Sequence, residues 1–162
     1  MLAALAGAAL VTAGCGDDPE PEALPSFTAS ASADDETAVE AAYREYEDAI
    51  EAMAASGDPE PAQLRPYATP ERAQEDAENL AILFDQDYRV VGTTSIDVRS
   101  VTVTGEKAVV EACIDASKWI TVKKGESPAP GETGDAPGLA RVDLVQQDGR
   151  WLVSKSADAG AC

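Results

Sequence analysis

Histidine is absent from this 162-residue sequence, and basic residues are scarce: 12 Lys and Arg stand against 30 Asp and Glu. Without histidine the chain lacks the commonest acid–base and metal-binding side chain. A formal net charge of −18 repels phosphate backbones, which bind to clustered Lys and Arg. We therefore expect no nucleic acid among the partners, and we predict neither a metal site nor a bound cofactor.

Long apolar runs are also lacking, because the apolar segment formed by residues 1–14 is shorter than the roughly 20 helical residues that cross a bilayer. It ends in the small pair Ala13-Gly14 directly before Cys15, a pattern typical of an export signal. The run Leu10-Val11-Thr12-Ala13-Gly14-Cys15 resembles the bacterial lipobox. That resemblance implies that residues 1–14 are a lipoprotein signal peptide, here without its usual basic start, and that Cys15 carries acyl chains such as palmitate.

The segment after Cys15 has few residues that could form a core. Residues 15–35 are mostly Asp, Glu, Pro, Ser and Ala, which cannot bury enough apolar surface to fold. We predict a disordered acidic tether that holds a folded domain, residues 36–162, at the extracytoplasmic face of the cell membrane. Cation capture by the acids of residues 17–22 is the alternative, but two prolines among them spread the carboxylates apart.

Two helices are predicted in the first half of the domain. Apolar residues recur at steps of three and four over residues 36–55, with Asp34 or Asp35 as the cap and Glu47 on the polar face. Thr69 is a good cap for a second helix, because Pro70 follows at the first helical position. This second helix should bury apolar residues as far as Phe84.

The second half of the domain has the alternation typical of strands. We expect one long strand or two short ones at residues 89–103, with a bulge near Ser100 where the alternation changes phase. Asp148-Gly149 predicts a type I′ turn between two paired strands. The remaining predicted strands are residues 108–115, 119–124, 141–147 and 150–156, and residues 125–138 form a loop. Helices followed by an antiparallel sheet define an α+β fold.

Three cysteines are present, and if Cys15 carries lipid, Cys113 and Cys162 remain as a pair in an oxidising compartment. We expect them to form a disulfide. Two free thiols are the alternative, and a metal site is disfavoured because no third thiol and no histidine are available.

The segment Gln147-Asp148-Gly149-Arg150-Trp151-Leu152-Val153, placed after two helices and a sheet, resembles the last hairpin of the nuclear transport factor 2-like (NTF2-like) cone fold. Residues 36–162 also resemble lipoproteins of high-GC actinobacteria in residues 64–69, in the segment from Cys113 to Trp119 and in Cys162. The resemblance implies helices packed on a curved antiparallel sheet, with a pocket between the first helix and the concave face. Relatives use that pocket as an enzyme site, a ligand pocket or a dimer surface.

Three functions are compatible with these features. The first is a non-catalytic module that binds a small molecule or a protein, as a monomer or weak dimer; the second is an accessory subunit of an envelope complex. The third is an isomerase or cyclase of the ketosteroid-isomerase type, which needs a carboxylate base and a donor such as Tyr. Its only candidates are Tyr43, Tyr46 and Tyr88 with Asp97 or Asp115. Tyr43 and Tyr46 fall on the apolar stripe, so we predict no enzyme and assign no catalytic residue. Trp119 and Trp151 are expected in the core.

Overall fold

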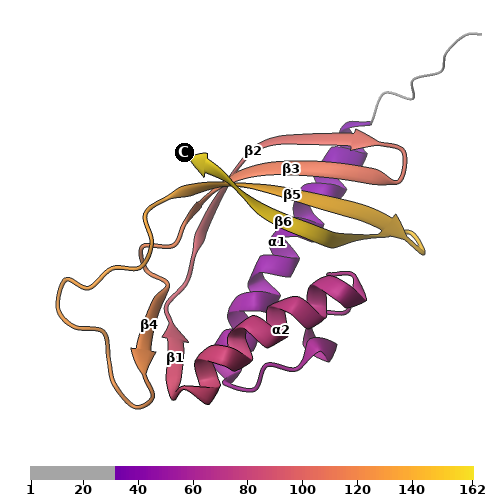
Figure 1. Ribbon diagram of the computed structural model, residues 1–162. Helices are drawn as coiled ribbons and strands as arrows, with labels where there is room; N and C mark the ends of the chain where they lie inside the picture. The colour runs from indigo at the N-terminus through magenta and orange to yellow at the C-terminus, as the bar shows by residue number, and fades with distance from the viewer. Residues whose placement is uncertain (1–31) are drawn as a thin grey trace, which may run out of the picture.

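The computed structural model describes residues 32–162 (Figure 1), so the predicted signal peptide, Cys15 and most of the predicted tether lie outside the described residues. Two helices, α1 (Ala33–Ser56) and α2 (Pro70–Asp85), are joined through a short 3-10 helix, η1 (Pro61–Gln63). Six strands follow: β1 (Tyr88–Val91), β2 (Ser95–Thr104), β3 (Lys107–Asp115), β4 (Ile120–Lys123), β5 (Gly138–Gln147) and β6 (Arg150–Ala161). The helices pack against a curved antiparallel sheet, which confirms the predicted α+β cone fold.

Helix α1 starts earlier than predicted because Ser32, rather than Asp34 or Asp35, is its cap. The Ser32 hydroxyl accepts a hydrogen bond from the Asp35 amide, and the Asp35 carboxylate accepts one from the Ser32 amide, both at 3.2 Å. These reciprocal bonds form a capping box, which satisfies amides that have no partner within the helix. Residues 33–35 therefore belong to the helix and not to the tether.

Helix α2 begins as predicted, with Thr69 as the cap and Pro70 at the first helical position. The same segment also fastens the helices to the sheet. The Thr69 amide donates to the Val153 carbonyl, and the Val153 amide donates to the Tyr67 carbonyl, each at 2.9 Å. This short parallel bridge covers part of the outer edge of β6.

Residues 89–103 form two strands that belong to different sheets. Strand β1 pairs with β4 in a two-stranded sheet, whereas β2 is the edge of a four-stranded sheet ordered β2-β3-β5-β6. Gly92 lies between them with φ of 93°, and a Cβ there would collide with the carbonyl oxygen of Lys118. Glycine is therefore required where the chain passes from one sheet to the other.

The predicted bulge and turn are both confirmed. The β2–β3 register shifts between Val98 and Ser100, which brings Ile96, Val98, Val101 and Val103 to the same inner face. The β5–β6 turn has positive φ at both central residues, 51° at Asp148 and 75° at Gly149, as a type I′ turn requires. Strand β6 is longer than predicted, because its pairing with β5 continues to Ala161.

The core lies between α1, α2 and the inner face of the four-stranded sheet. Its largest fully buried side chains include Tyr43, Met53, Leu64 and Leu144. Trp151 is buried as predicted, and Trp119 is partly buried against the same cluster. None of the helices within residues 32–162 is both long and apolar enough to cross a membrane.

Cys113 and Cys162 form a disulfide in the structure, with Cα atoms 5.8 Å apart. Cys113 is on β3 and Cys162 follows β6, and β5 lies between these two strands. The bond therefore clamps the start of β5, where Leu139 pairs with Cys113 on one side and with Gly160 on the other.

Candidate functional site

The interface between α1 and the inner face of the sheet is filled by side chains. Tyr43 projects from the middle of α1 and is fully buried, and Val110, Val142 and Leu144 of the sheet are at most 1% exposed. Phe84 and Trp151 are also buried in this cluster. The position where the resemblance implied a pocket is therefore part of the hydrophobic core, and three hollows of the described surface lie along α1.

The residues proposed for an isomerase do not come together. Asp97 points outward from β2 and pairs with Arg99 at 3.1 Å, while Asp115 accepts a hydrogen bond from the Ser117 amide at 2.9 Å in a turn. Hydrogen bonds from Ser117 lower the pKa of Asp115, which makes it a poorer base. Tyr88 lies on β1, in the two-stranded sheet and not in the four-stranded sheet that carries Asp97 and Asp115. The Lys123 ammonium is 3.9 Å from the centre of its ring.

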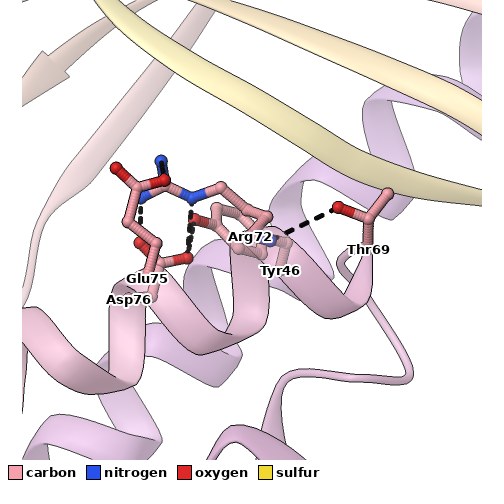
Figure 2. A network of polar contacts seen from close by, with 5 residues as sticks. All are labelled: Tyr46, Thr69, Arg72, Glu75 and Asp76. Atoms are coloured by element: carbon pink, nitrogen blue, oxygen red, sulfur yellow. Dashed lines mark hydrogen bonds and ion pairs between the residues drawn. The ribbon is translucent and has the colours of Figure 1, made fainter.

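Tyr46 belongs to a buried polar network that joins α1 to α2 (Figure 2). Its hydroxyl donates to Asp76 Oδ2 at 2.6 Å, and Arg72 Nε donates to the same oxygen at 2.8 Å. Arg72 Nη2 also pairs with Asp76 Oδ1, and Arg72 Nη1 lies 3.1 Å from Glu75 Oε2. Asp76 is only 7% exposed, so this charge is buried with its partners supplied.

Burial keeps Tyr46 protonated. Burial raises the pKa of Tyr46 to about 12, and the nearby Arg72 guanidinium opposes that rise. The phenol therefore remains a hydrogen-bond donor over the physiological pH range. Because the donor is already used by Asp76, Tyr46 has a structural role between the helices.

Glu47 lies on the opposite flank of α1 and was not anticipated as a site residue. The Glu47 side chain is half-buried. Burial raises its pKa to about 7, and a weaker effect of hydrogen bonding with Tyr43 acts to lower that pKa. The Tyr43 hydroxyl is buried and has no hydrogen bond of good geometry within residues 32–162, although it lies close enough to Glu47 to influence that carboxyl. Burial also raises the pKa of Tyr43 above its ordinary value.

Glu47 lines a hollow of about 200 Å³ between α1 and the start of β2. Two side chains of α1 bond to backbone groups of the opposite wall. Arg44 Nη1 donates to the Ile96 carbonyl at 3.3 Å, and Glu51 Oε1 accepts from the Thr94 amide at 2.6 Å. Glu51 Oε1 also accepts from the Thr94 hydroxyl at 2.7 Å.

A second hollow, of about 320 Å³, continues along the same side of α1. Glu36 and Glu40 line it from the helix, and residues 98–101 line it from β2. Arg44 lies between the two hollows, where it pairs with Glu40 at 2.8 Å. We call the two hollows together the α1–β2 groove. Its lining holds five carboxylates and two guanidinium groups, so it is acidic.

A third hollow, of about 330 Å³, lies on another side of α1 and is mostly apolar. Ala38, Ala41 and Ala42 line it from the helix, and Tyr67 and Trp151 line it from the segment before α2 and from β6. Trp151 thus borders both the core and this hollow. Within residues 32–162 no group of three or more acidic or cysteine side chains is arranged to hold a metal ion.

Comparison with known proteins identifies a similar fold. No family model and no curated protein sequence matches this chain. The intermembrane space region of the chloroplast protein ARC6 superimposes with a TM-score of 0.54 at 14% identity, over 78% of this chain and 98% of that one. At this identity the similarity shows a shared fold alone.

Two further solved structures are more distant. A variant of the designed NTF2-like protein Rd1NTF2_05 has a TM-score of 0.44 at 12% identity, over 72% of this chain and 96% of that one. The SEC-C motif protein RPA3114 from Rhodopseudomonas palustris has a TM-score of 0.40 at 14% identity, over 75% of this chain and 89% of that one.

Proposed function

We propose that this protein is a lipid-anchored, extracytoplasmic module that acts by binding a partner and not by catalysis. The lipid on Cys15 would hold the domain at the membrane, and the acidic segment that follows would keep it at a distance from anionic head groups. The observation that carries the binding role is the α1–sheet interface around Tyr43, because within residues 32–162 side chains fill the position that a reaction site of this fold would occupy.

Two features support the extracytoplasmic location. The run from Leu10 to Cys15 has the small residues and the cysteine that lipid attachment requires. The disulfide between Cys113 and Cys162 is of a kind that persists in oxidising compartments and is rare in the cytosol. Both features agree with display of the domain on the outer side of the membrane.

Metabolic labelling with an alkyne analogue of palmitate tests the anchor. We expect the native protein to incorporate the label and to sediment with membranes, and Cys15→Ser to lose both properties. Cys162→Ser is the matched control, because it removes a different sulfur and should keep the label. Labelling that persists in Cys15→Ser, or unlabelled native protein in the cytosol, would refute the proposed location.

An accessory subunit of an envelope complex is a special case of this binding role. Its partner would be a stable component of the membrane fraction. Chemical crosslinking in intact cells followed by mass spectrometry tests it, and crosslinks from α1 or β2 to one recurrent protein would support it.

A second candidate function is proton transfer on a small molecule, as in an isomerase, and Glu47 favours it. A half-buried carboxyl with a pKa near 7 beside a tyrosine hydroxyl is a suitable general base. Isomerisation of a β,γ-unsaturated 3-ketosteroid to its conjugated ketone, followed by ultraviolet absorbance, tests this reaction. Turnover that is lost in Glu47→Gln and kept in Glu45→Gln would establish the isomerase function. Absence of turnover by the native protein would refute a role of Glu47 in that reaction.

A further inference from the structure

The outer edge of β2 lies beside acidic side chains of α1, because Glu36 and Glu40 line one hollow together with residues 98–101. Strand β2 ends the order β2-β3-β5-β6, and within residues 32–162 no strand pairs with its other side. Figure 1 shows the N-terminal end of α1 lying beside this edge. A free strand edge is a template for adding another strand, and proteins usually cover or block such edges.

Helix α1 blocks only the first part of the edge. Arg44 donates to the Ile96 carbonyl and Glu51 accepts from the Thr94 amide, so two side chains replace the hydrogen bonds that a neighbouring strand would make. Within the described chain no hydrogen bond from α1 reaches β2 beyond Ile96. Residues 98–101 line the hollow together with Glu36 and Glu40, with the bulge between Val98 and Ser100, and the edge continues past the hollow to Thr104.

The charges of the groove define what could occupy it. Its five carboxylates outnumber its two arginines, and each arginine lies beside a carboxylate, Arg44 beside Glu40 at 2.8 Å and Arg99 beside Asp97 at 3.1 Å. Glu36 makes no ion pair within residues 32–162. Basic side chains therefore suit this wall, while acidic and phosphorylated segments are repelled.

We propose that residues 98–104 of β2 bind an extended, Lys- or Arg-rich segment of a partner protein, which adds to the sheet as a fifth strand beside Glu36 and Glu40. Backbone hydrogen bonds to the β2 edge hold the segment, and alternate basic side chains meet the carboxylates of α1. This inference rests on the proposed binding role and names the chemistry of its partner. Electrostatic attraction to a chain of net charge −18 also raises the rate of encounter.

Amide hydrogen exchange of the full chain in detergent micelles tests the proposal, with the peptide Lys-Val-Lys-Val-Thr-Lys-Val as the probe. We expect added peptide to slow exchange at residues 98–104, with an effect that weakens as salt is added. A peptide with alternate N-methylated amides lacks the donors of one edge and should give no protection. These two peptides leave the protein unchanged, so the result does not depend on a variant that folds.

Paired variants of the protein test the acidic wall. Glu36→Gln with Glu40→Gln should raise the Kd of the peptide about tenfold, because two of the carboxylates that meet it are lost. Glu126→Gln with Glu132→Gln is the matched control, since it removes the same charge from the exposed loop after β4 and should leave the Kd unchanged. Circular dichroism confirms that both double variants are folded.

Several results would overturn the proposal. Equal binding of the N-methylated peptide, or an equal loss of affinity in the control variant, would mean nonspecific attraction to an acidic protein. Protection of β2 that appears without peptide and grows with protein concentration would mean that a second copy of the chain occupies the edge. Protection confined to the apolar hollow at Tyr67 and Trp151 would refute this site and still support a binding module. Absence of acyl labelling in the native protein would refute only the proposed anchor.

Discussion

The two flanks of α1 differ in how completely their polar groups are paired. Towards α2, the Tyr46 hydroxyl and the Asp76 carboxylate have partners at 2.6 to 2.8 Å, and the buried charge is balanced by Arg72. Towards β2, the Tyr43 hydroxyl has no good hydrogen-bond partner among residues 32–162, and burial raises the pKa of Glu47 to about 7. The buried polar groups facing α2 therefore hold the two helices together, whereas Tyr43 and Glu47 are buried on the other flank with less complete hydrogen bonding.

The largest expected effect comes from breaking the paired flank. Asp76→Asn leaves the Arg72 guanidinium buried without its counter-charge, so we expect the free energy of unfolding to fall by about 3–5 kcal/mol in urea denaturation. Glu75→Gln is the control, because Glu75 contacts the same arginine from a largely exposed position and should cost about 1 kcal/mol or less. Equal losses in the two variants would contradict the distinction between the flanks.

Removing the hydroxyl of Tyr46 should have an intermediate effect. Tyr46→Phe deletes a buried donor to a carboxylate, for which we expect a loss of about 1.5–3 kcal/mol, while Arg72 still neutralises Asp76. The double variant with Asp76→Asn should lose less than the sum of the single losses, since both changes remove the same contact. Strict additivity would show that the hydroxyl does not act through Asp76.

Glu47→Gln should change how stability depends on pH. In the folded protein the pKa is about 7 and in the unfolded chain about 4.5, so between these values the folded state binds more protons. The stability of the native protein should therefore fall as pH rises from about 4.5 to about 7, by about 1–3 kcal/mol from this group. The difference in unfolding free energy between Glu47→Gln and the native protein should follow that curve. A difference independent of pH would contradict the raised pKa.

Tyr43→Phe should have the smallest effect. Its hydroxyl is buried and has no good hydrogen-bond partner among residues 32–162, so its removal should change the unfolding free energy by about 0.5 kcal/mol or less. Because Tyr43 lowers the pKa of Glu47, the variant should move that pKa further above its ordinary value. Carbon-detected NMR of the Glu47 carboxyl measures the shift. A loss as large as that of Tyr46→Phe would show that the two tyrosines are equivalent.

Much of the fold could be predicted from local patterns. Thr69 before Pro70 identified the start of α2, and Asp148-Gly149 identified the type I′ turn. Both signals act within a few residues, where backbone preference decides the structure. The bulge near Ser100 was predictable because the apolar alternation changes phase there. Without a bulge, Val101 and Val103 would point away from the core. Ser32 was missed because the composition of its segment suggested a tether, and its cap depends on one hydrogen-bonded pair with Asp35.

The candidate site could not be predicted in the same way. Periodicity placed Glu47 on the polar face of α1, which is correct for the isolated helix. In the folded protein the segment of Thr94 and Ile96, about 50 residues later, forms the opposite wall of the hollow that Glu47 lines. Tyr46 and Asp76 are 30 residues apart, so no sequence spacing connects them. The identity of β2 as the sheet edge depends on β1 pairing with β4, which the strand pattern left open.

The disulfide sets how the domain would respond to mechanical load. Because the disulfide joins residues 49 positions apart, the segment between them cannot be extended while the bond is intact. That segment has a contour length of about 170 Å. If the domain were stretched between Ser32 and Cys162, α1, α2 and the strands before Cys113 could unravel, while the β5–β6 hairpin would carry no tension. An oxidised protein in an optical trap should therefore extend about 170 Å less than a reduced one.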